Sequence, residues 1–297
     1  MNSGKNKFQV AGLGEILWDL YAEGKQLGGA PANFAYHAQQ HGAQSYVISS
    51  IGNDTLGQKI ITHLDSVKLS HRYITIDHTH PTGVVTIELD DAGKPVYRIH
   101  ENAAWDHIPC SENTVRLVQN LDAICFGSLS QRTPESANTI QEILKQAHQD
   151  CLRVFDINIR LNYYSRDLID RLLALCNVLK LNDEEIVLIA DLFNIKGSES
   201  EILKTLTDKH ELKLIVLTKG VDGSRLYSGT EDSDFAGVKA VKIIDTVGAG
   251  DSFTATVVMG FLSQRPLDEI NLRANQVACY VCSQKGAMPV LPDHLLF

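Results

Sequence analysis

The 297-residue sequence is short of cysteine, of basic charge and of long apolar runs. Its six cysteines are widely scattered, which excludes the disulfide framework of a small secreted protein. The formal net charge of −9 argues against a nucleic-acid-binding face, which needs clustered lysine and arginine. No apolar run approaches the roughly 20 residues of a membrane span, and residues 1–8 lack the apolar core of a signal peptide. We therefore expect a cytoplasmic protein without nucleic-acid or membrane partners.

Several familiar motifs are missing as well. The segment Gly12-Leu13-Gly14 follows an expected strand, but Leu17 stands where the dinucleotide fingerprint needs its third glycine. No G-x-x-x-x-G-K-[ST] occurs, which excludes a P-loop kinase. His37 and His41 have helical spacing without the glutamate of a zinc-protease motif, so we expect two histidines on a helix surface.

One C-x-x-C motif, Cys279 and Cys282, lies inside the helical stretch 272–284. A zinc site needs a second such pair, and a redox motif needs a turn before its helix. We therefore expect both cysteines to be packed helix residues.

Short apolar segments alternate with amphipathic segments along most of the chain. The expected strands are 8–14, 45–51, 123–127, 153–157, 178–181 and 214–218, and the expected helices are 33–41, 55–64, 136–149, 166–175, 183–192, 199–209 and 252–262. This alternation predicts an α/β fold, with a mostly parallel central sheet covered by helices on both faces.

Two segments, 15–30 and 72–107, instead have only β character. The second is rich in Thr, Val, Ile and Tyr, and its turn at Asp90-Asp91-Ala92-Gly93 is typical of a hairpin. We expect the two segments to form a small antiparallel sheet that acts as a lid over the carboxyl edge of the main sheet. No linker or repeat interrupts the chain, so 1–297 is expected to form a single domain.

The strongest chemical signal is 244–253, Ile-Asp-Thr-Val-Gly-Ala-Gly-Asp-Ser-Phe. Ile243 and Ile244 are expected to end a strand, and Gly248-Ala249-Gly250 to open a helix. Such a turn presents free N–H groups and the positive end of the helix dipole to an anion. Asp251 faces the same place and could accept the proton of a hydroxyl that attacks a phosphoryl group. The alternative is an N-capping aspartate.

The segment 245–253 resembles the carboxyl-terminal signature of the ribokinase-like (PfkB) carbohydrate kinases. Four more motifs resemble that family in the expected order: Gly-Gly-Ala-Pro-Ala-Asn at 28–33, Gly52-Asn53-Asp54 with Gly57, Asn182-Asp183-Glu184-Glu185, and Thr-Lys-Gly-Val-Asp-Gly at 218–223. The resemblance covers nearly the whole chain. It implies a ribokinase-like fold and ATP-dependent phosphorylation of a small sugar.

The residues near the first strand suit a hydroxyl-rich substrate. Asp19 could accept hydrogen bonds from sugar hydroxyls, although it could also be a solvated loop residue. Gly28 and Gly29 allow the backbone to lie under a ligand. Asn33 can both donate and accept, and a helix N-cap is its alternative role. The resemblance implies that these residues bind substrate.

Asp156, Asn158 and Arg160 alternate at the end of an expected strand, so their side chains should point in one direction. Arg160 could hold a sugar hydroxyl or the transferring phosphoryl oxygens. The family motif places it near the substrate, and a strand-end salt bridge is the alternative.

The resemblance also implies a nucleotide site. Asn182, Thr218, Gly220 and Gly223 would lie along the nucleotide, and Asn275 near its adenine. In this hypothesis the N–H groups of Ala249 and Gly250 stabilise charge on the γ-phosphoryl group.

Two cations belong to the same hypothesis. Glu185 would order water around Mg²⁺, which usually keeps several waters, and a first-turn acid beside a helix-capping Asn182 is the alternative. By resemblance, Asp245 and the carbonyls of Val247 and Gly286 would bind a monovalent cation such as K⁺.

The sequence of 14–20, Gly-Glu-Ile-Leu-Trp-Asp-Leu, is more similar to the fructokinase-like branch than to ribokinases. Ribokinases commonly carry a lysine after the two glycines, where this chain has Ala30-Pro31. Fructose is therefore the expected substrate. The alternatives are 2-keto-3-deoxygluconate, ribose or a nucleoside, or a non-catalytic sugar-binding regulator. In this family the lid often pairs with a second lid, which suggests a homodimer.

Overall fold

The computed structural model describes residues 7–21, 24–89, 95–238 and 242–297, and the account below concerns these ranges. Nine described strands form one sheet: β1 (Gln9–Leu13), β4 (Gln44–Gly52), β5 (Ser70–Asp77), β8 (Ala123–Gly127), β9 (Leu152–Asp156), β10 (Val178–Asn182), β11 (Leu214–Thr218), β12 (Ser224–Tyr227) and β13 (Asp232–Phe235). Their order is β13-β12-β11-β10-β9-β8-β1-β4-β5. The strands from β5 to β11 are parallel, and β12 and β13 form an antiparallel edge. The predicted fold class is confirmed.

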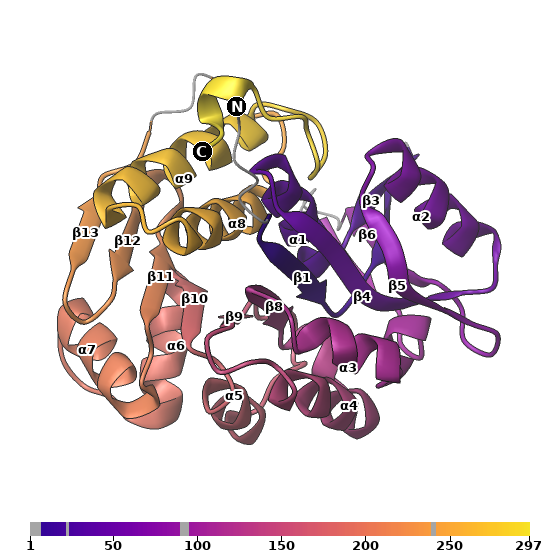
Figure 1. Cartoon of the computed structure of the whole chain (residues 1–297), viewed down its shortest axis with the longest axis horizontal. Helices are drawn as coiled ribbons and strands as arrows, with labels where there is room; N and C mark the ends of the chain where they lie inside the picture. The colour runs from indigo at the N-terminus through magenta and orange to yellow at the C-terminus, as the bar shows by residue number, and fades with distance from the viewer. Residues whose placement is uncertain (1–6, 22–23, 90–94, 239–241) are drawn as a thin grey trace.

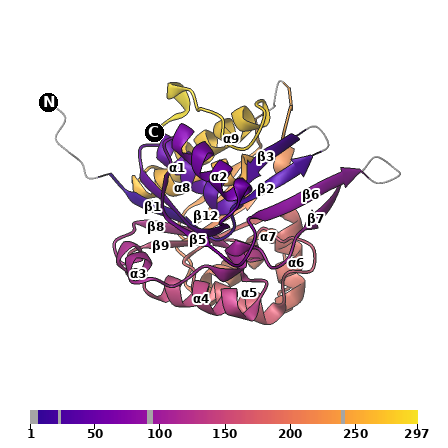
Figure 2. The ribbon, with the colours of Figure 1, turned by 90° about the vertical axis from the view of Figure 1, so that its right-hand side faces the viewer.

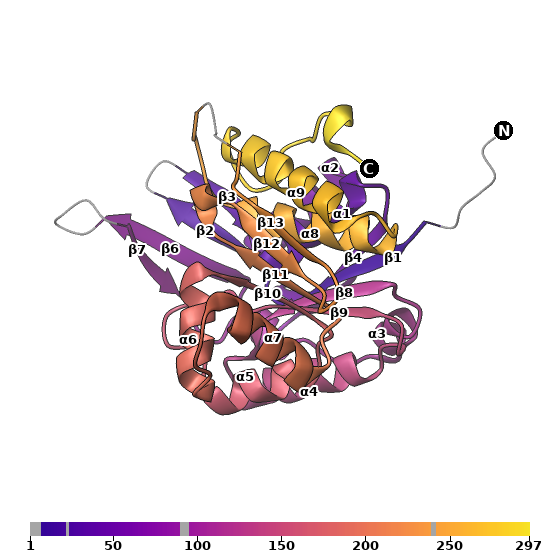
Figure 3. The same ribbon diagram turned by 90° about the vertical axis from the view of Figure 1, so that its left-hand side faces the viewer.

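Helices cover both faces of this sheet (Figures 1 and 2). One layer contains α1 (Ala30–Gln40), α2 (Thr55–Ser66), α8 (Ala249–Leu262) and α9 (Leu267–Cys282). The other contains α3 (Glu112–Val118), α4 (Pro134–Lys145), α5 (Arg166–Leu173), α6 (Asp183–Phe193) and α7 (Glu199–His210). Figure 3 shows the same two layers from the opposite side.

The central strands are buried along almost their whole length. In β1, Ala11 and Leu13 pack toward the α3–α7 layer, whereas Val10 packs against α1 and α8. Because both faces are covered, such strands have continuous apolar runs rather than alternating ones. The same arrangement brings the carboxyl ends of β1, β8, β9, β10 and β11 to one edge of the sheet.

A second sheet of four strands contains β2 (Leu17–Tyr21), β3 (Gly24–Gly28), β6 (Gly83–Leu89) and β7 (Pro95–Ile99), in the order β3-β2-β6-β7. It projects beyond the large sheet (Figure 3) and corresponds to the predicted lid. After β7, the carboxylate of Asp106 accepts two hydrogen bonds from the buried guanidinium of Arg132, at 2.6 and 2.8 Å, which anchors the base of this lid.

Two details of the predicted lid are wrong. Its second segment, 72–107, begins too early, because Ser70–Asp77 form β5 at the edge of the large sheet. The lid is also not fully antiparallel, since β2 and β6 pair in parallel and come from different parts of the chain. The expected turn at Asp90-Asp91-Ala92-Gly93 lies outside the described residues, and a single domain over 1–297 stays a prediction.

Other differences have local causes. The described residues around Ile243 and Ile244 form no strand, and both side chains are more than half exposed, so this apolar pair does not belong to the sheet. The hairpin β12–β13 was not predicted, because its polar sequence gives little strand signal. No described helix is both long and apolar enough to cross a bilayer.

The amino end of α1 lies directly against β1. An ideal β-carbon at Gly12 would lie 1.9 Å from the carbonyl oxygen of Pro31, so only glycine allows this approach. The first turn of α1 therefore sits at the carboxyl end of β1.

His37 and His41 do not lie on the helix surface, as predicted, but are buried between α1 and its neighbours. His37 donates through Nε2 to the carbonyl oxygen of Ala287 at 2.8 Å, and His41 contacts Thr256 Oγ1 at 3.0 Å. Burial lowers the pKa of each imidazole from 6.5 to about 4. In His41, the charges of His37 and Arg273 add to this effect.

Because these two histidines are buried and have low pKa values, we predict that the folded state loses stability in acid. The unfolded chain takes up protons near pH 6.5, and the folded chain only near pH 4, so the stabilisation is complete above pH 6.5 and is lost as the pH falls toward 4. We expect the free energy of unfolding, measured with urea, to fall by roughly 1 kcal/mol per pH unit for each histidine.

The variant His37→Gln/His41→Gln should flatten this pH dependence, whereas His71→Gln, at a surface ion pair with Asp65, should leave it unchanged. If the free energy of unfolding of the double variant falls as steeply with decreasing pH, the two histidines are not the cause of the acid sensitivity.

Candidate active site

A cavity of about 1310 Å³ lies between the lid and the carboxyl edge of the large sheet. Of the predicted site residues, only Glu185, Asp245 and Gly286 are absent from its wall. The others that line it are Asp19, Gly28, Gly29, Asn33, Arg160, Asn182, Thr218, Gly220, Gly223, Val247, Gly248, Ala249, Gly250, Asp251 and Asn275. The fold thus brings together residues from both ends of the chain.

The Gly-Ala-Gly turn opens α8 toward this cavity. Gly248 is the N-cap, with a left-handed φ of 80°, and none of the described side chains caps the helix. Asp251 lies in the first turn, partly exposed to the cavity, and is not the N-cap. The alternative of a capping aspartate is therefore wrong. The first N–H groups of α8 stay available to an anion.

Asp251 is held by α1. Its Oδ2 accepts a hydrogen bond of 2.7 Å from Asn33 Nδ2. Asn33 lies in the first turn of α1, whose N-cap is Gly29, so Asn33 is not a cap. Burial, followed by the charge of Asp156, raises the pKa of Asp251 to about 6, although the bond from Asn33 opposes this shift. A carboxylate of this pKa is mostly ionised at pH 7 and can accept a proton.

The lid end of the cavity contains Asp19, on β2. Its carboxylate lies over the backbone of Gly28, since an ideal β-carbon there would be 2.3 Å from Asp19 Oδ2. Burial raises the pKa of Asp19 to about 6, against the opposing charge of Arg160. Gly29 has a φ of 113° and connects β3 directly to α1.

Arg160 lines the cavity, but the predicted alternation is wrong. The strand β9 ends at Asp156, and the left-handed φ of Asn158 (43°) turns the chain. Asp156 is buried, whereas Arg160 is exposed and donates to the carbonyl oxygen of Ile159. Asp156 and Arg160 therefore do not point in one direction.

A buried cation was missed in the sequence. Lys180, on β10, lines the cavity, and its Nζ lies 2.9 Å from Asp156 Oδ1. Burial lowers the pKa of this ammonium, but the charges of Asp156, Glu185 and Asp251 outweigh burial and raise it, so Lys180 is charged. A lone lysine in an otherwise apolar strand, Val-Leu-Lys-Leu-Asn, was the available signal, because a buried charge needs a partner.

A buried acid, Glu15, was also missed. It follows β1, is 3% exposed and lines the cavity. Burial, opposed by its own backbone N–H and increased by the charge of Asp251, raises its pKa to about 7. The signal was an acid placed among apolar residues immediately after a buried strand.

Asn182 and Glu185 form a capping box at the start of α6. Asn182 Oδ1 accepts from the N–H groups of Glu184 and Glu185, and Glu185 Oε2 accepts from the N–H of Asn182. Glu185 Oε1 accepts from the N–H of Ile159. Each carboxylate oxygen keeps one lone pair, and a contact of Glu185 with Mg²⁺ through water stays a prediction. No cluster of three or more metal-ligating acids, histidines or cysteines occurs in the described ranges.

The other end of the cavity combines turns with an apolar surface. Thr218 ends β11, and Gly220 and Gly223 lie in the turn between β11 and β12. The amide nitrogen of Asn275, which lines the cavity, donates to Ser224 Oγ at 2.7 Å and to the carbonyl oxygen of Asn271 at 2.8 Å.

Three side chains here are apolar and exposed: Val221, Val238 and Ile243, at 80%, 38% and 56%. Such a patch inside a cavity is typical of a site for a flat apolar group. Cys279 and Cys282 lie beside it in α9, half-buried, as expected of helix residues.

Asp245, Val247 and Gly286 are brought together beside the Gly-Ala-Gly turn. Asp245 Oδ1 accepts from the N–H of Val247 at 3.0 Å, and Oδ2 from the N–H of Gly286 at 3.1 Å. The carboxylate thus fixes the loop before α8, and a monovalent cation site stays a prediction.

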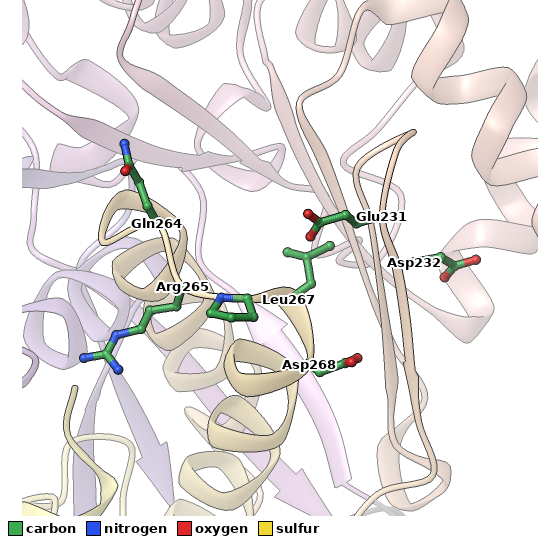
Figure 4. Close-up of a pocket in the computed structure, with 7 residues that line it drawn as sticks. Glu231, Asp232, Gln264, Arg265, Leu267 and Asp268 are labelled. Atoms are coloured by element: carbon green, nitrogen blue, oxygen red, sulfur yellow. The ribbon is translucent and has the colours of Figure 1, made fainter.

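A second hollow, of about 570 Å³, lies between the β12–β13 turn and the connection from α8 to α9 (Figure 4). It is lined by Glu231, Asp232, Gln264, Arg265, Pro266, Leu267 and Asp268, none of which is a predicted site residue.

Residues 22–294 match the model of the pfkB family of carbohydrate kinases. The chain belongs to this family. The uncharacterised sugar kinase PH1459 of Pyrococcus horikoshii is 30% identical over 294 residues, which cover 94% of this chain and 91% of that protein. The resemblance found in the sequence is confirmed, and the chain is a sugar kinase of the PfkB family.

Other relatives differ in substrate at similar identity. The fructokinase of Escherichia coli is 28% identical, with coverage of 94% of this chain and 95% of that protein. The ATP-dependent 6-phosphofructokinase of Thermoanaerobacterium thermosaccharolyticum is 26% identical, with 97% and 92% coverage. Identity alone therefore does not choose between a sugar and a sugar phosphate.

Solved structures agree with the fold. PH1459 in complex with ATP has a TM-score of 0.80 at 27% identity and covers 94% of both chains. The fructokinase of Xylella fastidiosa with bound ATP has a TM-score of 0.83 at 19% identity, with 96% and 95% coverage, a likeness of fold alone.

Alanine substitutions of the two glycines of the turn, Gly248 and Gly250, are predicted to have opposite effects on folding and on nucleotide binding. A β-carbon at Gly248 would lie 2.8 Å from Ala287 Cβ, at a φ of 80°, so Gly248→Ala should lower the free energy of unfolding by about 2 kcal/mol or more. A β-carbon at Gly250 meets only Lys180 Nζ, at 3.6 Å.

Gly250→Ala is therefore expected to fold normally but to bind nucleotide more weakly, because the added methyl would occupy the place predicted for the anion. Thermal unfolding and nucleotide titration check both variants, and normal nucleotide affinity in Gly250→Ala would contradict a phosphate at this turn.

Proposed function

We propose that this PfkB-family kinase transfers the γ-phosphoryl group of ATP to a small neutral sugar, with fructose as the first candidate. The observation that carries the proposal is the position of Asp251, ionisable near pH 6, between Asn33 and the open N-terminus of α8. A sugar hydroxyl at this point can lose its proton to Asp251 while it attacks a phosphoryl group held by the N–H groups of Ala249 and Gly250.

The charge at the lid end supports a neutral sugar. The described lid residues that line the cavity are Leu17, Asp19, Tyr21, Gly28, Val85, Ile87, Tyr97 and Ile99. This set contains one acid and no lysine or arginine, and Glu15 adds a second acid nearby. A phosphorylated sugar would meet two carboxyls there and one cation, the exposed guanidinium of Arg160, so the balance of charge would still cost binding energy. Hydroxyls, in contrast, can donate to Asp19.

In this proposal ATP extends from the Gly-Ala-Gly turn to the apolar surface of Val221, Val238 and Ile243, where adenine would lie beside Asn275. The ATP complexes of related kinases support the use of ATP. Mg²⁺ would supply charge neutralisation, with Glu185 holding one of its waters. Since phosphoryl transfer has a loose transition state, placement and charge matter more than a strong base.

We further propose that Lys180 is the cation that contacts the phosphoryl group during its transfer. It is buried beside Gly250, whereas the guanidinium of Arg160 is exposed and weakened by water. In a partly dry site an ammonium stabilises developing phosphoryl charge more strongly. Arg160 would then serve the sugar side of the cavity.

A panel of sugars tests the substrate. ADP release is measured with fructose, ribose, 2-keto-3-deoxygluconate, a nucleoside and fructose 6-phosphate. We expect fructose to give the highest kcat/KM. Fast turnover of 2-keto-3-deoxygluconate would instead identify a carboxylate-bearing substrate, for which Arg160 is the candidate counter-charge, and sugar binding without ADP release would identify a regulator. A lid-to-lid dimer is checked separately by the mass in solution.

Removal of the base should affect turnover rather than binding. Asp251→Asn should lower kcat by roughly 10²- to 10⁴-fold with little change in sugar affinity. In the native protein, kcat/KM should fall as the pH drops through about 6, because Asp251 becomes protonated. Undiminished kcat in Asp251→Asn, measured by ADP release, would refute this role.

Substitutions of Lys180 and Arg160 should have different effects in the same assay of ADP release. We expect Lys180→Met to lower kcat by about 100-fold, and Arg160→Met to act mainly on the KM for sugar. Because Lys180→Met leaves Asp156 buried without its ion pair, Lys180→Gln/Asp156→Asn is the control for folding. If this neutral pair is stable and turns over at the native rate, Lys180 has no catalytic role.

A further inference from the structure

The side chain of Glu15 has no part in the mechanism proposed above. It is buried, yet it lies in the wall of the cavity with Asp251, Asn33 and Gly29. Its Oε2 has no hydrogen-bond partner among the described residues. A buried polar atom without a partner costs free energy, and such atoms are rare in folded proteins.

A second acceptor in the same wall is also unpartnered. Asn33 uses its Nδ2 to hold Asp251, while its Oδ1 is buried without a partner in the described structure. Glu15 and Asn33 lie at the same helix start, since an ideal β-carbon at Gly29 would be 2.4 Å from the carbonyl oxygen of Glu15. The wall beside the base therefore offers two buried acceptors that lack donors.

Because both atoms are hydrogen-bond acceptors, they favour a ligand group that donates a hydrogen bond. A phosphate oxygen is itself an acceptor and carries negative charge, so it can satisfy neither Glu15 Oε2 nor Asn33 Oδ1. A hydroxyl is a donor and satisfies either acceptor. The matching ligand therefore carries at least one hydroxyl besides the one that faces Asp251.

We propose that Glu15 is a substrate-binding residue that sets specificity: its Oε2 accepts a hydrogen bond from a sugar hydroxyl other than the one that Asp251 deprotonates. This inference rests on the proposed sugar-kinase function. It predicts a requirement for a particular second hydroxyl, because an analogue without it leaves the buried carboxyl unpaired.

The ionisation of Glu15 supports the same role. Its carboxyl, with a pKa of about 7, is surrounded by Asp251 from α8, Arg160 after β9 and Cys125 on β8. A donated hydrogen bond favours the ionised form. Sugar affinity should therefore improve as the pH rises through 7.

The experiment combines substrate and protein variants. Monodeoxy analogues of the accepted sugar are compared with the parent sugar in the native chain, in Glu15→Ala and in the isosteric Glu15→Gln. Binding is measured by calorimetry and turnover by ADP release. In the native chain we expect one analogue to bind about 10- to 100-fold more weakly than the parent.

In Glu15→Ala the parent sugar should bind about as weakly as that analogue, and the difference between the two should disappear. Glu15→Gln should keep part of the difference, because its amide oxygen still accepts, but should lose the pH dependence near 7. Nucleotide affinity should stay native in both variants, which shows that they are folded. The control Glu184→Gln removes an exposed carboxylate from the cavity wall and should leave the analogue-to-parent ratio unchanged.

The inference is overturned if every analogue keeps its native penalty in Glu15→Ala, or if nucleotide affinity falls as much as sugar affinity. The outcome is separate from that of the proposed function. A chain that binds sugar with the expected dependence on Glu15 but releases no ADP refutes the kinase proposal alone, and a chain that binds no sugar refutes both.

Discussion

The arrangement of the cavity depends on the meeting of two helix N-termini. Asn33, in the first turn of α1, and Asp251, in the first turn of α8, are 218 residues apart in sequence and 2.7 Å apart in space. The close contact of Pro31 with Gly12 fixes one helix, and the packing of Gly248 against Ala287 fixes the other. Because both helices point their positive ends at one place, that place favours negative charge.

This constraint explains why an acidic protein can hold a polyanion. The overall charge of −9 repels a nucleotide, so attraction must come from placed groups. Lys180 is surrounded by the carboxyls of Asp156, Glu185 and Asp251, which keep it charged in a buried site. The same carboxyls would repel phosphate, and the free N–H groups of α8 offset them at short range.

Much of the fold follows from the sequence, because buried parallel strands and glycine turns leave strong local patterns. The turn at 248–250 and the polar ends of β10 and β11 were predicted on this basis, whereas Glu15 after β1 was not. The cation beside the turn, Lys180, was not predicted, because the sequence pointed to Arg160 instead. Arg160 is exposed, and this depends on how the chain leaves β9, where Asn158 takes a left-handed conformation. The predicted boundary of the lid was wrong for a similar reason. Ser70–Asp77 has β character, and only its pairing with β4 assigns it to the large sheet.

The connection between lid and sheet has a mechanical consequence. The strand β3 ends at Gly28 and α1 begins at Ala30, so Gly29 is the whole linker between them. Of the residues at this junction, Gly29 is the one outside both elements, so a change in the angle between this side of the lid and α1 would be taken up first by its backbone. Gly29 also forms part of the cavity wall. A ligand in contact with Gly29 would therefore touch the same residue that joins β3 to α1, so occupancy of the cavity and orientation of this side of the lid would be linked through one glycine.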